Sequence, residues 1–254
     1  MFYDFLRLRI VAPIVRALLA FKVIGLERLD APGGALVAGN HLSSGDTFPI
    51  PVVLRRRVYS LARRSLFTAT NPKGRFLAWI LRLACQVPME TGGGPGAVES
   101  LNTLTGMLRD GQVVAIFPEG TRSPDGRLYR FHTGVARLAL AAGVPVFPLA
   151  CVNTRIRRGL LGLPSMRGAT LTIGEPLHFD EYFGRQDDAA VVRYVTDRIA
   201  ATIQHMTGQT YVDVYAQRVK SGELTSAQAD AFVSDRLAAG DVPPPDRQAP
   251  GMAS

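Results

Sequence analysis

Short apolar runs alternate with longer amphipathic runs along most of this sequence. This alternation is typical of a mostly parallel sheet whose strands are joined by crossover helices. A chain of 254 residues, of which 47% are hydrophobic, can bury the core of one large domain. The expected fold class is therefore α/β, a single domain with a mostly parallel twisted sheet flanked by helices. We predict strands at 35–39, 57–62, 112–117, 144–152 and 169–174 and helices at 97–110, 133–143 and 187–206.

The N-terminal residues are apolar but carry charges at intervals. A secretory signal needs an unbroken apolar core, and a membrane-spanning helix needs roughly 20 mostly uncharged residues, so neither is expected. Arg9 and Arg16 lie seven positions apart and therefore on one side of a helix. We predict an amphipathic helix over residues 1–21. It either lies in the plane of a membrane with its arginines at the headgroups or covers the core of the domain.

Composition indicates the remaining boundaries between the segments of the chain. The α/β domain is expected over 22–206 and a C-terminal helical extension over 207–239. The tail 240–254 is rich in proline and nearly without apolar residues, and we predict that it is disordered. The glycine-rich stretch "METGGGPGAVES" lacks the lysine and spacing of a phosphate-binding P-loop, so we interpret it as a flexible connection.

The formal net charge is +8, and arginines cluster at 55–64 and 155–158. This favours an anionic partner, whether phosphate, a phosphopantetheine nucleotide, anionic lipid or nucleic acid. No basic repeat interleaved with aromatic residues is present, which argues against nucleic acid. Cys85 and Cys151 have no metal-ligand spacing, so we expect no metal site and two buried thiols in a reducing compartment.

The stretch "NHLSSGD" places His41 five residues before Asp46, directly after an apolar run. On one helix these side chains would lie roughly 140° apart and could not touch, but a turn could bring them together. The carboxylate would then accept a hydrogen bond from one imidazole nitrogen and leave the other as a base. The simpler alternative is a capping aspartate beside an exposed histidine.

A second stretch, "FPEGTRS", also leaves an apolar run. Gly120 would let the backbone approach a ligand, and the planar guanidinium of Arg122 matches phosphate oxygens. Taken alone, the stretch is better explained by a Glu119–Arg122 ion pair that ties the loop.

Together, "NHLSSGD", the basic and aromatic segment "ARRSLF", "FPEGTRS" and "VPVFPLA" resemble the glycerolipid acyltransferase family, in particular its 1-acylglycerol-3-phosphate acyltransferases. The resemblance covers roughly residues 20 to 180. It implies that His41 is the general base and Asp46 its orienter. It also implies that Arg122 holds the acceptor phosphate, that Glu119, Gly120 and Thr121 shape the loop of the acceptor site, and that either Arg63 or Arg64 supplies a second cation. For those two arginines, a solvated or membrane-facing basic edge is an equal alternative.

One short stretch departs from the family pattern. Where the family often reads "VPVDR", this chain reads "VPMET", so that Glu90 and Thr91 replace an aspartate and a phosphate-binding arginine. The identity of the acceptor therefore stays open.

Two aromatic residues allow more than one interpretation. His132 is expected to cap the helix near 133, and Trp79 is expected in the core or, if exposed, at an acyl groove or membrane interface.

The resemblance implies an enzyme that moves a fatty acyl group from acyl-CoA or acyl carrier protein to a lysophospholipid hydroxyl. 1-Acylglycerol 3-phosphate is the favoured acceptor, and no cofactor is expected besides the thioester co-substrate. We expect the protein on the cytoplasmic face of a membrane, peripheral or monotopic, with anionic lipid as a partner. The alternatives are an acyl-thioester hydrolase and a non-enzymatic protein that binds anionic lipid.

Overall fold

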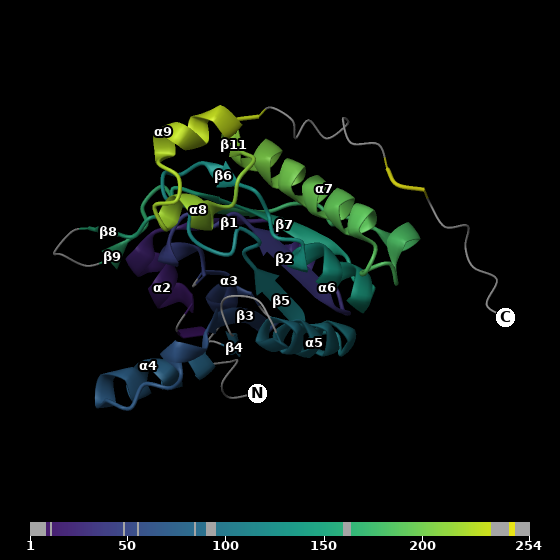
Figure 1. Ribbon diagram of the computed structural model, residues 1–254. Helices are drawn as coiled ribbons and strands as arrows, with labels where there is room; N and C mark the ends of the chain where they lie inside the picture. The colour runs from purple at the N-terminus through teal and green to yellow at the C-terminus, as the bar shows by residue number, and fades with distance from the viewer. Residues whose placement is uncertain are drawn as a thin grey trace.

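The computed structural model describes residues 9–10, 12–47, 49–54, 56–83, 85–89, 95–159, 164–234 and 244–246. Its centre is a seven-stranded sheet in the order β1-β10-β7-β2-β5-β3-β4 (Figure 1). The bounds of these strands are β1 Lys22–Ile24, β2 Ala35–Gly39, β3 Val58–Arg63, β4 Gln86–Met89, β5 Val113–Ile116, β7 Val146–Val152 and β10 Thr170–Ile173.

The predicted mostly parallel sheet is confirmed. Strand β2 pairs in parallel with β5 on one side and with β7 on the other, and β3 and β4 extend the parallel part. Strand β10 is antiparallel to β7, and β1 follows the direction of β10. The five predicted strands and three predicted helices all occur, each within two residues of its predicted bounds.

Helices cover both faces of the sheet. Their bounds are α2 Ala12–Leu19, α3 Pro49–Val53, α4 Pro72–Leu83, α5 Pro95–Arg109, α6 Gly134–Ala142, α7 Ala189–Thr207, α8 Ala216–Lys220 and α9 Ser226–Ala229. Short 3-10 helices are η2 Leu26–Leu29, η3 Ser44–Asp46, η4 Arg64–Leu66, η6 Asp180–Tyr182 and η7 Asp230–Phe232.

Alternation along the strands divides the core into two layers. Leu36 and Ala38 of β2 pack with the cluster formed by α5, α6 and α7, whereas Ala35 and Val37 face the cluster that includes residues of η2 and α3. Because β2 is buried on both sides, all five of its residues are apolar or glycine and buried. This explains why its sequence, "ALVAG", shows no polar alternation.

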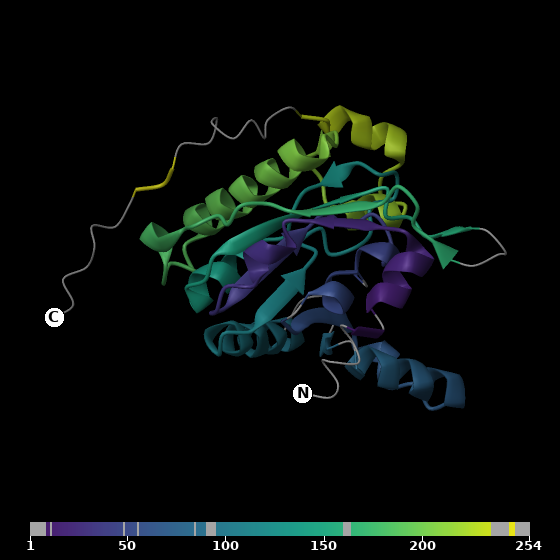
Figure 2. The ribbon, with the colours of Figure 1, turned by 180° about the vertical axis from the view of Figure 1, so that it is seen from behind.

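Two helices lie near the edge of the fold rather than over the centre of the sheet. Helix α2 packs against α3 and β9 yet exposes Ile14 and Leu18, and α4 follows β3 and exposes Phe76 and Trp79 (Figures 1 and 2). Most of the rest of the predicted helix 1–21, residues 1–8 and 11, lies outside the described residues. None of the helices within the described ranges is long and apolar enough to cross a bilayer.

The chain after α7 contributes one strand to a second, two-stranded sheet. Strand β11 (Tyr211–Val212) pairs in parallel with β6 (Leu128–Tyr129), and α8, α9 and η7 follow. Val212, Val214, Ala216 and Ala229 bury Tyr129 in a separate apolar cluster. A two-stranded hairpin, β8 (Arg157–Arg158) and β9 (Pro164–Ser165), projects beside α2, which packs against β9 (Figure 1). Most of the predicted tail 240–254 lies outside the described residues.

Candidate functional site

Two neighbouring strands deliver the two sequence motifs to one edge of the sheet. β2 ends at Gly39, two residues before His41, and β5 ends at Ile116, three residues before Glu119. The two strands are parallel and hydrogen-bonded to each other, so their carboxyl ends meet at the same edge. Open α/β sheets bind ligands at this edge.

A tight turn brings His41 and Asp46 into contact, as predicted. The His41 Nδ1 and Asp46 Oδ2 atoms are 2.8 Å apart. The turn is closed by Ser43, whose hydroxyl accepts a hydrogen bond from the Gly45 amide (2.8 Å) at the start of η3. The sequence "LSSG" therefore supplies the cap and the small residue that the reversal needs.

The pair is asymmetric in its exposure to solvent. The Asp46 side chain is fully buried, whereas the His41 side chain keeps 17% of its surface exposed. A carboxylate can only accept, so Nδ1 of a neutral His41 carries the proton and Nε2 is the basic nitrogen. The imidazole also stacks on the Phe117 ring, with centroids 4.3 Å apart. This arrangement fixes both the tautomer and the plane of the base.

Asp46 is held by more groups than the sequence indicated. Its Oδ2 accepts from the backbone amides of Leu42 (2.6 Å) and Ser43 (2.7 Å), and its Oδ1 accepts from the Thr154 hydroxyl. The Thr154 carbonyl in turn accepts from the Ser43 hydroxyl (2.8 Å). Thr154 follows β7, more than a hundred residues away in sequence, and sequence reasoning missed it.

Glu119 connects the two motifs through the backbone. Its Oε1 accepts from the His41 amide (2.8 Å) and its Oε2 from the Tyr129 amide (3.2 Å). The alternative of a Glu119–Arg122 ion pair is therefore wrong. Burial raises the pKa of the Glu119 carboxyl to about 8, although both backbone N–H groups act in the opposite direction.

The loop after Glu119 is anchored at its far end too, because the Ser123 amide donates to the His41 carbonyl (2.7 Å). Gly120 has a φ of 72°, and a Cβ there would lie 3.0 Å from the His132 ring. Thr121 is buried, and its hydroxyl accepts from the Lys220 ammonium (2.8 Å). Arg122 is exposed and makes no hydrogen bond or ion pair with the described part of the chain. Its guanidinium can therefore bind an anion without first breaking an ion pair.

The other predicted cations lie at the end of the neighbouring strand. Arg63 is the last residue of β3, and Arg64 opens η4 with an exposed side chain. Because β3 pairs in parallel with β5, both residues lie at the same edge of the sheet as His41. Glu90 and Thr91 lie outside the described residues.

Two further positions reveal contacts that the sequence did not suggest. Asn40 crosses to β7 by donating to the Cys151 carbonyl (2.9 Å) and accepting from its amide (2.7 Å), and its amide group also donates to Gln209 (2.7 Å). His132 stacks on Tyr215, with ring centroids 4.4 Å apart. Both Gln209 and Tyr215 belong to the C-terminal segment, so its packing could not be read from local motifs.

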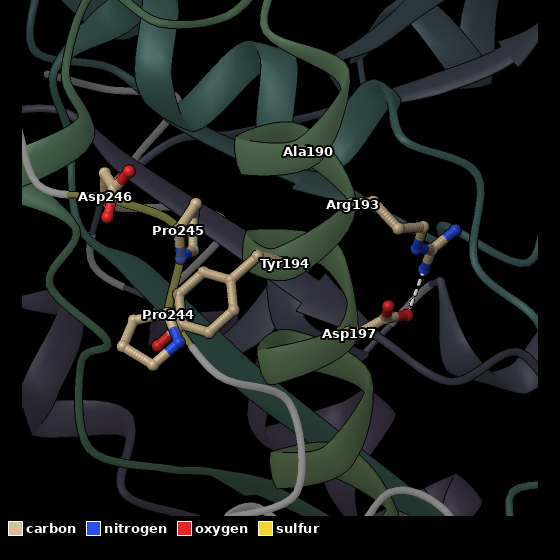
Figure 3. A pocket seen from close by; sticks show the side chains of 7 residues that line it. All are labelled: Ala190, Arg193, Tyr194, Asp197, Pro244, Pro245 and Asp246. Carbon is tan, nitrogen blue, oxygen red and sulfur yellow. Dashed lines mark hydrogen bonds and ion pairs between the residues drawn. The ribbon is translucent and has the colours of Figure 1, made fainter.

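A cleft of about 470 Å³ opens between α7 and residues 244–246 (Figure 3). Arg193, Tyr194 and Asp197 line it from the helix, and Arg193 forms an ion pair with Asp197. None of the residues at the edge of the sheet described above lines this cleft. Among the described residues, no group of three or more His, Cys, Asp and Glu side chains is arranged to hold a metal ion.

Comparisons with known proteins point to one family. The model of a family described as Acyltransferase matches residues 20–152, more than half of the chain. A 1-acyl-sn-glycerol-3-phosphate acyltransferase of Bacillus subtilis is 30% identical over 159 residues, covering 62% of this chain and 73% of that protein. The chloroplastic enzyme LPAT1 of Arabidopsis thaliana is 28% identical over 62% of this chain but only 43% of its own length, and BAT2 of Brassica napus is matched over 36% of its length.

A solved structure shows the same fold. The crystal structure of the 1-acyl-sn-glycerophosphate acyltransferase PlsC from Thermotoga maritima matches with a TM-score of 0.54 and 23% identity, over 77% of this chain and 76% of that one. The matched residues 20–152 include both motifs and the strands that carry them. This chain therefore belongs to the acyltransferase family.

Proposed function

We propose that this protein is an O-acyltransferase that moves a fatty acyl group from an acyl-CoA or acyl carrier protein thioester to the hydroxyl of a lysophospholipid, with 1-acylglycerol 3-phosphate as the favoured acceptor. The observation that carries the proposal is the buried Asp46 carboxylate 2.8 Å from Nδ1 of a partly exposed His41, at the edge of the sheet where parallel strands end. The names of the relatives support the same acceptor class.

The chemistry follows from the tautomer of His41. Nε2 takes the proton of the acceptor hydroxyl while the hydroxyl oxygen attacks the thioester carbonyl. The tetrahedral intermediate expels the thiolate, and the imidazolium returns the proton to the sulfur, which leaves an ester and a free thiol. Asp46 stabilises the imidazolium that forms between these steps. A positioned imidazole contributes about 10²–10⁴-fold to such a step.

Three arginines at this edge of the sheet offer charge for a phosphate. Arg122 lies in the loop that is tied to His41 through Glu119 and Ser123, so an anion held by its guanidinium is close to the base. Arg63 ends the neighbouring strand β3, and Arg64 follows it. Glu119, Gly120 and Thr121 fix the shape of the loop. The proposed roles of these residues thus divide between proton transfer and acceptor binding.

The substrates themselves argue for a membrane surface. An acceptor with a long acyl chain resides in a bilayer, whereas the thioester donor carries a nucleotide or a protein and approaches from water. We accordingly place the protein on the cytoplasmic face of a membrane as a peripheral or monotopic protein, with anionic lipid beneath its basic surface.

The test is release of free thiol from palmitoyl-CoA by the purified protein in detergent. The reaction is run with lysophosphatidic acid, with glycerol 3-phosphate or without acceptor, and it is compared with His41→Ala and with His178→Ala, an exposed histidine outside the site. We expect release that depends on an acceptor, is abolished in His41→Ala and is retained in His178→Ala. Release without acceptor would instead identify a thioesterase, and equal rates in both variants would overturn the role of His41.

A further inference from the structure

The segment after α7, residues 209–234, packs on the connection between β5 and α6. Besides the pairing of β11 with β6, the Gln209 side chain donates to the Gly126 carbonyl (2.6 Å). Arg127, in the same connection, forms an ion pair with Asp230 (2.6 Å). Three separate contacts thus hold the C-terminal segment against the loop that carries Arg122. The match to the family ends at residue 152, well before this segment.

This packing brings one cation to the middle of the loop. Lys220 is the last residue of α8, and its Nζ donates to the Thr121 hydroxyl at 2.8 Å. Thr121 lies midway between Glu119 and Ser123, the two residues bonded to the His41 backbone. Two residues of chain span at most about 7 Å, so the ammonium lies close to the proposed site of acceptor binding.

The chemistry of the cluster suits a phosphate monoester. Arg122 offers a planar fork of donors, and Lys220 places a compact ammonium charge beside the Thr121 hydroxyl, next to Arg122 in the loop. Two cations, Arg122 in the loop and Lys220 bonded to the adjacent Thr121, match the double charge that a phosphate monoester carries near neutral pH. A neutral acceptor would gain nothing from the second cation.

We propose that Lys220, delivered by the C-terminal segment, is a second cation of the acceptor site and sets the preference for a phosphorylated acceptor over a neutral one. This inference rests on the proposed function, because it assigns a role at the same site. It makes the C-terminal segment part of the acceptor site rather than a support that only packs on the loop.

The test measures KM and kcat with lysophosphatidic acid and with 1-monoacylglycerol, and the inhibition constant of glycerol 3-phosphate for the transfer reaction. The variants are Lys220→Met, Lys220→Arg and Arg218→Ala. Arg218 lies on the same helix and pairs with Glu223 (2.6 Å). Arg218→Ala therefore removes one positive charge, as Lys220→Met does, but away from Thr121. We expect Lys220→Met to raise KM for lysophosphatidic acid and the inhibition constant about ten-fold, the size of one hydrogen bond to a charged group. Lys220→Arg and Arg218→Ala should stay within about three-fold of wild type.

Each outcome separates this inference from the proposed function. Loss of all transfer in His41→Ala, together with unchanged constants in Lys220→Met, would refute the role of Lys220 while leaving the acyltransferase in place. An equal loss with both acceptors and no change in the inhibition constant would also overturn it, because a merely structural contact does not distinguish a phosphate from a hydroxyl. Absence of transfer by the wild type would refute the proposed function, and direct binding of glycerol 3-phosphate that is unchanged in Lys220→Met would then refute the inference separately.

Discussion

Asp46 combines structural and electrostatic roles in one buried carboxylate. It accepts hydrogen bonds from two backbone amides, from the Thr154 hydroxyl and from the His41 ring. A neutral amide of the same shape cannot accept all of these, because one of its two positions is a donor. The carboxylate therefore fixes the turn that presents His41 as well as the protonation state of the ring.

We expect Asp46→Asn to lower kcat by about 10²–10⁴-fold with little change in KM for the acceptor, because the imidazolium loses its partner and the tautomer is no longer enforced. Steady-state kinetics of acceptor-dependent thiol release measure this. Asp110→Asn is the matched control, since Asp110 is exposed and precedes β5 at the opposite edge of the sheet. A kcat within a few-fold of wild type in Asp46→Asn would contradict the assignment.

Glu119 makes the stability of the protein depend on pH. In the folded state burial raises the pKa of its carboxyl from 4.5 to about 8, so the folded protein retains a proton that the unfolded chain releases. The resulting stabilisation is complete below about pH 4.5 and is lost as the pH rises toward about 8.

We expect Glu119→Gln to remove this pH dependence. The variant loses one backbone acceptor and is less stable at pH 5, but the difference in free energy of unfolding between wild type and variant should shrink as the pH rises to 8, by the order of a few kcal/mol. Urea denaturation at pH 5, 6.5 and 8 gives the two profiles. Parallel profiles over this range would show that Glu119 is ionised throughout.

The residues of the site differ in how far the sequence reveals them. His41 and Asp46 lie five positions apart, and Glu119 to Arg122 are consecutive, so their chemistry can be inferred from one short window each. Thr154, Gln209 and Lys220 reach the site only because β7 and the C-terminal segment fold back onto it. A threonine, a glutamine and a lysine have no local pattern that distinguishes them from ordinary surface or core residues.

The loop that carries Arg122 depends on one glycine. Gly120 has a left-handed φ of 72°, and its α-carbon faces the His132 ring, which is itself held by stacking on Tyr215. The loop thus approaches an aromatic pair that has little freedom to move. The prediction that His132 caps α6 is not supported. Thr133, not His132, directly precedes the first residue of α6, and the Thr133 side chain makes no capping hydrogen bond.

A left-handed backbone conformation costs an alanine about 1–2 kcal/mol. We expect Gly120→Ala to destabilise the protein by more than this, because the added Cβ would lie 3.0 Å from His132. Gly126→Ala is the matched control. Gly126 also has a positive φ, of 90°, but nothing lies within 4 Å of its Cβ position. Thermal unfolding and KM for the acceptor should both change more in Gly120→Ala. Equal effects of the two substitutions would show that the close contact with His132 does not add to the destabilisation.

Periodicity predicted the elements that build the centre of the fold better than those at its edge. β2, β5 and β7 are continuous buried runs bounded by turn residues, and α5, α6 and α7 have long apolar faces, so pattern and structure agree. Strand β4 has only four residues and contains a proline, and β1 has three, so both are too short for a clear signal. Their pairing with the sheet, not their own sequence, makes them strands.

Considered as a whole, the molecule gathers exposed apolar side chains on one side. Helix α2, helix α4 and the β8–β9 hairpin lie toward the same end in both views (Figures 1 and 2). Most of the large exposed hydrophobic residues belong to these elements, to η4 before α4, or to the residues just before α2 and β8, namely Ile10, Ile14, Leu18, Leu66, Phe76, Trp79 and Ile156. Exposed arginines accompany them, including Arg16, Arg75, Arg82 and Arg157. This combination is typical of a surface that rests on anionic lipid.

Trp79 provides a direct test of that orientation, since it is the one tryptophan of the sequence and is 55% exposed. It stacks on Phe76, with ring centroids 5.9 Å apart, so both rings should enter the lipid interface together. We expect vesicles containing phosphatidylglycerol to shift the tryptophan emission to shorter wavelength and brominated lipids to quench it. Neutral vesicles should bind less tightly, and added salt should weaken binding to the anionic ones, because each arginine near the surface contributes about 1 kcal/mol that salt screens.

The matched variants are Phe76→Ser and Phe232→Ser, which remove exposed aromatic rings from α4 and from η7 in the C-terminal segment. Burial of one such ring stabilises by about 1.5–3 kcal/mol, so Phe76→Ser should lower the partition coefficient about ten-fold or more, and Phe232→Ser should leave it unchanged. If Trp79 emission is unaffected by anionic vesicles that nevertheless sediment with the protein, α4 faces water and another surface binds the membrane. An equal loss in both variants would show that overall hydrophobicity, rather than this face, determines binding.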